Sequence, residues 1–359
     1  MSGPARPSVE SVRHEFTPDG VYLNTATYGL PPASAIAALD EAVDAWRRGT
    51  ARAAAYDEWV ERGRRAFAEL VGVDPTWVST GTLVSPFVGL VAASVPDGAR
   101  VLCAAGEFTS VLFPFLVHHD RGVQVDVVPL EAIADHVDER THLVAVSAVQ
   151  SADGRIADLD AVAEAAARHG ARTLVDATQA AGWFPLDATR FDHVVVGAYK
   201  WLLSPRGTSF LTVRPDAPAS LRPLHANWYA SADPWTAIYG PPLRLAPDAR
   251  RFDSSPAWLN WVGTAVALEL IGSVGAEVIG AHDRALAADA ADRLGVADPA
   301  SAILSLPVAD AEAAVAQLDA AGIQAAVRAG AVRTSFHLHN TGDDVDALVR
   351  AVGHLVRRP

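Results

Sequence analysis

One lysine stands out because it is the only primary side-chain amine in the chain. Lys200 lies in the segment of residues 193–201, just after the apolar run Val194-Val195-Val196, and the remaining Lys/Arg positive charge is all arginine. Arginine stays protonated in proteins, whereas lysine can lose its proton and attack a carbonyl carbon. The sequence therefore predicts that Lys200 is a nucleophile.

The apolar run that precedes Val194-Val195-Val196 in the chain ends in an acidic residue, Asp176. Asp176 follows Leu174-Val175, and Gln179 comes three residues later. A pyridine cofactor needs a carboxylate opposite its ring nitrogen, so that the ring stays protonated and accepts electrons. Alone, an acid in this place is also typical of a turn or a helix cap. A lysine and an acid that follow successive strands favour the cofactor site.

The elements that position these residues form an alternating pattern. Short apolar runs at residues 101–104, 125–128, 143–147, 173–175, 193–196 and 209–213 are separated by helical segments, for example 159–167. This pattern predicts an α/β fold with a mostly parallel sheet covered on both faces, whose ligands bind at the carboxyl ends of the strands. We expect an N-terminal segment at 1–20, a large domain at 21–250, and a helical connection with a small C-terminal α/β domain at 251–359. Residues 215–256 read as loops.

Composition excludes several classes of protein. The formal net charge is −13 and no basic block is present, which argues against a nucleic-acid surface. No apolar run is long enough to cross a membrane, and the polar N-terminus lacks a signal-peptide pattern. The one cysteine, Cys103, lies in an apolar run and predicts a buried thiol in a reducing compartment. We therefore expect a soluble, cytoplasmic protein.

Three motifs together resemble one enzyme family. They are D-A-T-Q at 176–179, G-A-Y-K-W-L-L-S-P-R-G at 197–207 and V-R-T-S-F-H-L-H-N-T at 332–341. They resemble the class V aminotransferases, pyridoxal 5′-phosphate (PLP) enzymes of fold-type I that include cysteine desulfurases, kynureninase and isopenicillin N epimerase-like proteins. The resemblance implies a PLP Schiff base on Lys200, an amino-acid substrate and a homodimer with shared active sites.

The same resemblance implies roles for further residues around the cofactor. Lys200 would also move the Cα proton, Asp176 would pair with the pyridine nitrogen, and Gln179 would contact the ring hydroxyl. Phe108 would stack on the ring, and Gln150 would lie near it. The implied phosphate ligands are Gly81, Thr82, Tyr199 and, from the neighbouring subunit, Ser255.

Substrate contacts follow from the resemblance as well. Arg333 matches the arginine that clamps the substrate α-carboxylate, and Asn24, Thr25 and Ala26 match a segment that lines the substrate site. Tyr28, Trp228, Tyr229 and Trp235 are candidates for an aromatic cage around a trimethylammonium group, which the substrate of the ergothioneine-pathway lyases carries. The histidine pairs His118-His119 and His337-x-His339 lack metal-site spacing, so we predict no metal.

The sequence leaves the reaction open among several alternatives. No cysteine follows Lys200, which argues against a desulfurase and leaves β-elimination, transamination and epimerisation. The segment L-N-T-A-T-Y-G-L-P-P at 23–32, Phe108 and the lysine motif most resemble the ergothioneine-pathway lyases, which cleave the C–S bond of hercynylcysteine sulfoxide. A class V aminotransferase, an epimerase and a non-enzymatic PLP-fold binding or regulatory protein are the alternatives.

Overall fold

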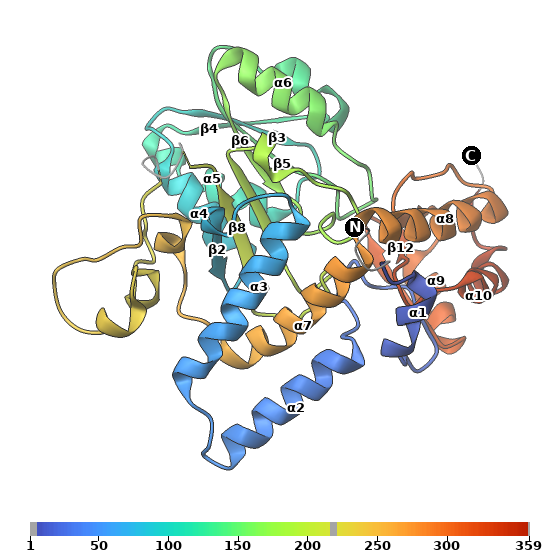
Figure 1. The fold of residues 1–359 in the computed structure, drawn as a ribbon. Helices are drawn as coiled ribbons and strands as arrows, with labels where there is room; N and C mark the ends of the chain where they lie inside the picture. The colour runs from blue at the N-terminus through green and yellow to red at the C-terminus, as the bar shows by residue number, and fades with distance from the viewer. Residues whose placement is uncertain (1–5, 216–220, 358–359) are drawn as a thin grey trace, which may run out of the picture.

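The computed structural model describes residues 6–215 and 221–357. A large α/β part is joined to a smaller C-terminal part (Figure 1). The first five residues of the expected N-terminal segment, and residues 216–220 of the expected loop region, lie outside the described residues.

A seven-stranded sheet forms the centre of the large part, in the order β2-β8-β7-β6-β5-β3-β4. Strands β3 to β7 pair in parallel, whereas β8 runs antiparallel to both β7 and β2. The predicted, mostly parallel sheet is therefore confirmed, with β8 as the reversed strand. The strands are β2 (Val78–Gly81), β3 (Arg100–Ala104), β4 (Gln124–Val128), β5 (Thr141–Ser147), β6 (Arg172–Asp176), β7 (His193–Gly197) and β8 (Ser209–Val213).

Alternate residues of these strands pack into two different cores. Leu102 and Val144 belong to the core that also contains side chains of α3 (Asp57–Leu70), α6 (Leu159–His169) and α7 (Trp258–Val274). Cys103 and Ala145 face the core formed with α4 (Val84–Ser94) and α5 (Thr109–Leu116). Successive side chains of a strand point to opposite faces, so both faces of the sheet are covered by helices.

The C-terminal part is built on a smaller antiparallel sheet, β11-β12-β9, with its own apolar core. Thr341 and Asp344 form a capping box at the start of α10. The elements are α8 (Ala276–Leu294), β9 (Ile303–Leu306), α9 (Ala311–Ala320), β10 (Ile323–Gln324), β11 (Ala326–Arg328), β12 (Ala331–Ser335) and α10 (Gly342–Val352).

The N-terminal residues run along the C-terminal part before they enter the large one. After α1 (Val9–Val12), the short strand β1 (Val21–Tyr22) pairs in parallel with β10, and Asn24 bridges to Ser335. The chain then forms α2 (Ala33–Arg47), which packs against α7. Residues 24–32 therefore pass from the small sheet to the large part of the molecule.

Within residues 6–215 and 221–357, no single helix is long and apolar enough to span a membrane, and α7 with α8 reaches that criterion only as a pair bent by 81°.

Candidate active site

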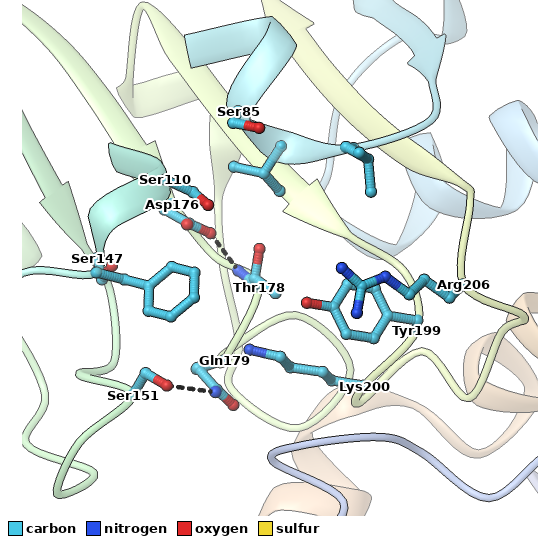
Figure 2. Close-up of a pocket in the computed structure, with 13 residues that line it drawn as sticks. Ser85, Ser110, Ser147, Ser151, Asp176, Thr178, Gln179, Tyr199, Lys200 and Arg206 are labelled. Carbon is cyan, nitrogen blue, oxygen red and sulfur yellow. Dashed lines mark hydrogen bonds between the residues drawn. The ribbon is translucent and has the colours of Figure 1, made fainter. Parts of the chain in front are cut away.

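The central strands bring the lysine and the acid to one edge of the sheet. Strand β6 ends at Asp176, and its parallel neighbour β7 ends at Gly197, three residues before Lys200. Both side chains point into one pocket of about 140 Å³ (Figure 2). The pocket is lined by Leu83, Val84, Ser85, Phe108, Ser110, Ser147, Ser151, Asp176, Thr178, Gln179, Tyr199, Lys200 and Arg206.

Lys200 is buried at this pocket, among aromatic rings. Its Nζ lies 5.5 Å from the ring centre of Phe108 and 5.6 Å from that of Tyr199. Burial lowers the pKa of Lys200 from 10.5 to about 7, opposed by the charge of Asp176 and assisted by nearby arginines, Arg333 first. A large fraction of the amine is therefore neutral near pH 7, which is the form that attacks a carbonyl.

Asp176 is buried and has one internal partner. Its Oδ1 accepts a hydrogen bond from the backbone N–H of Thr178 at 2.8 Å. Burial raises the pKa of Asp176 to about 6, and the hydrogen bonds from Thr178 oppose this shift. A cation placed beside the carboxylate would stabilise its charged form, so the site suits a protonated ring nitrogen.

The far end of the pocket has the properties of an anion site. Leu83, Val84 and Ser85 line it at the N-terminus of α4, and the N-cap residue Leu83 makes no capping side-chain hydrogen bond to the first amides. The guanidinium of Arg206 lies over the Tyr199 ring at 5.1 Å from its centre (Figure 2). Uncapped amides, the helix dipole and an arginine together can bind a phosphate.

Gly81 and Thr82 lie just before this helix and do not line the pocket of the single chain. A Cβ at Gly81 would lie 2.6 Å from the Phe87 ring, so the glycine allows the strand to approach α4 closely. Ser85 also lines the pocket, although it was not predicted from the sequence. The sequence feature that could have identified it is its position in the first turn of a helix that follows a strand.

The groups that line this pocket fit PLP. The pocket offers a neutral amine, a buried carboxylate, an anion site, and the face of Phe108, which remains 44% exposed at the pocket wall. Gln179 also lines the pocket, where its amide is held on both sides: Nε2 donates to the Ala26 carbonyl at 2.9 Å, and Oε1 accepts from Trp201 Nε1 at 2.8 Å. Gln179 thus ties the lysine loop to residues 24–29.

The predicted substrate segment packs directly on the lysine loop. The Gly29 N–H donates to the Tyr199 carbonyl at 2.9 Å, and the Tyr28 ring lies 6.3 Å from the Tyr199 ring. The side-chain oxygens of Asn24 and Thr25 are buried without a hydrogen-bond partner. These residues therefore border the site, although they do not line the pocket itself.

Arg333 projects from β12 toward the same region. Its guanidinium donates to Thr27 Oγ1 at 2.7 Å and to the Ser151 carbonyl at 2.5 Å, and Ser151 lines the pocket. Burial, together with the charge of Arg328, lowers the pKa of Arg333 to about 9. Within the described part of the chain, Arg333 forms no ion pair with a carboxylate, so it can take one from a ligand.

Other predicted residues lie away from the pocket of this chain. Gln150 is buried and donates to Glu107 at 3.3 Å, and Ser255 is exposed outside the pocket. Trp228 packs against Tyr229 and Trp235. The Tyr229 hydroxyl donates to Asp57 at 3.2 Å, so neither Trp228 nor Tyr229 faces Lys200 from within the same chain.

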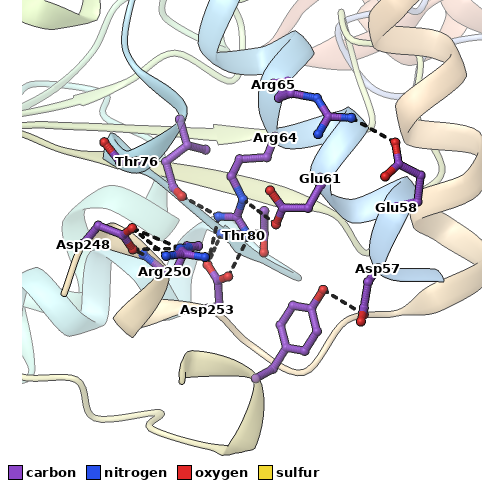
Figure 3. Close-up of polar contacts among 12 residues, drawn as sticks. Asp57, Glu58, Glu61, Arg64, Arg65, Thr76, Thr80, Asp248, Arg250 and Asp253 are labelled. Atoms are coloured by element: carbon purple, nitrogen blue, oxygen red, sulfur yellow. Dashed lines mark hydrogen bonds and ion pairs between the residues drawn. The ribbon is translucent and has the colours of Figure 1, made fainter. Parts of the chain in front are cut away.

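A buried ion pair supports the strand that leads to the anion site (Figure 3). Arg64 donates to Asp253 at 2.7 Å and to the Val78 carbonyl at 2.5 Å, and both ion-pair partners are buried. Asp253 accepts from the Thr80 N–H at 2.8 Å, and Ser254 N–H donates to the Thr80 carbonyl. Sequence reasoning did not identify this pair, because its partners are 189 residues apart.

Comparison with known proteins identifies the family. The family model for aminotransferase class-V matches residues 21–329. The chain belongs to this family. Its cofactor is PLP, as the family and the pocket indicate.

Similar sequences include an uncharacterized aminotransferase, YcbU, from Bacillus subtilis (strain 168), which is 32% identical over 65% of this chain and 64% of that protein. Isopenicillin N epimerase of Streptomyces clavuligerus is 28% identical over 68% of this chain and 66% of its own length. The chain thus spans just under two thirds of these relatives.

Solved structures share the fold. The cystine C–S lyase C-DES superposes with a TM-score of 0.86 at 21% identity, covering 94% of this chain and 98% of the other. A cysteine desulfurase from Thermococcus onnurineus NA1 gives 0.85 at 21% identity, covering 99% of each chain. The predicted fold-type I architecture is confirmed.

Proposed function

We propose that this chain is a PLP-dependent carbon–sulfur lyase that cleaves hercynylcysteine sulfoxide, a cysteine S-conjugate sulfoxide, by β-elimination in ergothioneine biosynthesis. One observation carries the choice of reaction. The only cysteine, Cys103, is buried in β3 beneath α4 and α5, and burial raises the pKa of its thiol to about 12. With no thiolate to accept sulfur, the sulfur atom must leave on a small molecule.

The residues of the pocket have distinct tasks in this proposal. Bound PLP supplies the electron sink for the electron pair left at the substrate Cα. The Lys200 amine holds the cofactor and then removes the Cα proton, while Asp176 keeps the ring nitrogen protonated and Gln179 contacts the ring hydroxyl. Arg333 binds the α-carboxylate, Phe108 stacks on the ring, and Tyr199, Arg206 and the start of α4 hold the phosphate.

Elimination then breaks the bond between Cβ and sulfur, and the electron pair of that bond departs with the sulfur. The products are a sulfenic acid, which a small-molecule thiol must then reduce by two electrons to give ergothioneine and water, and, after hydrolysis of the eliminated three-carbon fragment, pyruvate and ammonia. The trimethylammonium group of the substrate suits aromatic faces. Tyr28, 46% exposed beside Tyr199, is the aromatic residue of the proposed cage that lies nearest the pocket within one chain.

A cytoplasmic homodimer completes the proposal. Ser255 and Trp228 lie outside their own chain's pocket, so we assign them to the site of the partner subunit, whereas Tyr229 is buried in the core of its own chain. Apolar side chains Ile36, Val43 and Trp46 are exposed on α2 at 41%, 44% and 66%, which supports a contact surface there. Trp46→Glu should dissociate the dimer in sedimentation experiments and lower activity with it.

Product analysis tests the reaction. Purified holoenzyme with hercynylcysteine sulfoxide should release pyruvate and ammonia without any added keto acid. Turnover that requires a keto acid would identify an aminotransferase, and loss of substrate chirality without a new product would identify an epimerase. Bound PLP with no reaction toward any amino acid would indicate a binding or regulatory protein.

Because Lys200 is the only lysine of the chain, a second test can assign the cofactor linkage to one residue. Borohydride should fix the cofactor on one tryptic peptide, the one that contains Lys200, and Lys200→Ala should lose both the label and turnover. As a control, Cys103→Ala removes the thiol from the buried core without touching the pocket, and it should keep wild-type turnover. Loss of turnover in that control would contradict the lyase proposal.

A further inference from the structure

Two arginines share one face of the small sheet. Strands β11 and β12 pair with Ala326 opposite Arg333 and Arg328 opposite Ala331. Side chains of opposed residues, and of every second residue along a strand, lie on the same face. Arg328 and Arg333 are therefore diagonal neighbours. The two-residue turn Ala329-Gly330, with φ of 47° and 78°, matches the hairpin turn that holds the strands in this register.

Both guanidinium groups converge on one hydroxyl. Arg333 donates to Thr27 Oγ1 at 2.7 Å, and Arg328 donates to the same oxygen at 3.3 Å. A hydroxyl offers two acceptor lone pairs but no negative charge. Within residues 6–215 and 221–357, neither arginine is in an ion pair with a carboxylate. Two neighbouring cations, one of them buried, are thus left without an anion.

The phosphate and the α-carboxylate of the proposed ligands account for two of the three arginines at this site, and the third, Arg328, has no anionic partner within the described part of the chain. The phosphate has its own partners in Arg206 and the N-terminus of α4. One guanidinium can bind one carboxylate by a bidentate pair of hydrogen bonds, and Arg333 has this role for the α-carboxylate. Arg328 then remains beside the site, half-buried and without a carboxylate partner among the described residues.

We propose that Arg328 binds a second carboxylate at the far end of the substrate side chain, so that the site selects dicarboxylic amino acids. This inference rests on the proposed function, in which the substrate is a substituted cysteine, and it deepens it: hercynylcysteine sulfoxide carries a carboxylate at each end. Arg333 and Arg328 then bind the two ends of one ligand, and the Thr27 hydroxyl orients both side chains.

Matched ligand pairs test this assignment by binding. S-carboxymethyl-, S-(2-carboxyethyl)- and S-(3-carboxypropyl)-cysteine are each compared with the corresponding amide, which has the same shape without the charge. Affinity is measured on holoenzyme from the change in the visible spectrum of the bound cofactor and by calorimetry. We expect wild type to prefer the acid over the amide by roughly 10- to 100-fold at the best chain length. Arg328→Gln should lose most of that preference.

Two further variants keep the test decisive. Arg328→Lys retains the charge and should retain most of the preference. Arg350→Gln removes the same charge from an exposed position of α10 and should leave the preference unchanged. Absence of any preference in wild type, or an equal loss of affinity for acid and amide in Arg328→Gln, would overturn the proposal. Pyruvate release does not enter this readout, so a chain that shows the preference without lyase activity refutes only the lyase reaction.

Discussion

Gly29 offers a direct test of how the lysine loop is held. A Cβ at this position would lie 2.0 Å from the Lys200 carbonyl oxygen, whereas real Cβ contacts essentially never fall below 3.0 Å. The obstacle is backbone rather than a flexible side chain, so the loop must move by at least the difference, 3.0 − 2.0 = 1.0 Å. A displacement of about 1 Å at a catalytic group costs roughly 100-fold in rate. Overpacking of this kind costs about 1–3 kcal/mol in the free energy of unfolding.

Gly29→Ala should therefore lower kcat for pyruvate release about 100-fold and shift the visible band of the bound cofactor, which reports the lysine independently of any substrate. Gly272→Ala is the matched control, because no heavy atom lies within 4 Å of its added Cβ in α7. That control should keep wild-type kcat and gain up to about 1 kcal/mol of stability, as expected for a helix interior. Wild-type kcat and melting temperature in Gly29→Ala would refute the packing of residues 24–29 on the lysine loop.

Three further predictions follow from the site and its support. Because burial lowers the pKa of Lys200 to about 7, the rate of PLP capture by apoenzyme should rise with pH up to about 7 and level off above it; a rise that continues toward pH 10 would contradict the assigned burial. Asp176→Asn should lower kcat by about 100- to 1,000-fold at saturating PLP, since it removes the charge opposite the ring nitrogen, and unchanged kcat would exclude that role. Arg64→Met leaves the buried Asp253 unpaired and should cost about 3–5 kcal/mol in urea unfolding. Arg65→Met breaks only the exposed pair with Glu58 and should cost less than about 1 kcal/mol; equal losses would show that the buried pair is not special.

The pairing of Lys200 with Asp176 could be predicted because it depends on local pattern and one general rule. Each residue follows an apolar run, and the carboxyl ends of adjacent parallel strands meet at one edge of a sheet. The structure confirms that β6 and β7 are neighbours. The reversed direction of β8 could not be predicted, because an apolar run carries no sign of the direction in which it pairs.

The anion site and the loop aromatics were harder for a physical reason. At the start of α4 the binding groups are backbone amides, which every residue type provides, so the family resemblance alone pointed to Gly81 and Thr82, and no side-chain chemistry pointed to Ser85. The position of Tyr229 is set by its bond to Asp57, 172 residues earlier, and that of Asp253 by Arg64. Long-range polar partners of this kind leave no periodic signal in the sequence.

The residues of the proposed site come from two different sheets, and residues 24–29 contact the groups from both. Asp176 ends strand β6 of the large sheet and Lys200 follows β7, whereas Arg333 and Arg328 project from the small sheet. No strand joins these sheets within the described residues; instead, Asn24 bridges to Ser335, Thr27 accepts from both arginines, and Gly29 binds the Tyr199 carbonyl. This segment of six residues thus links the group that moves the proton to the groups that hold the substrate, alongside the direct bonds of Arg333 to the Ser151 carbonyl and of His337 to the Trp201 carbonyl. Substitutions in this segment should therefore change KM and kcat together, whereas a substitution in either sheet alone should change mainly one of them.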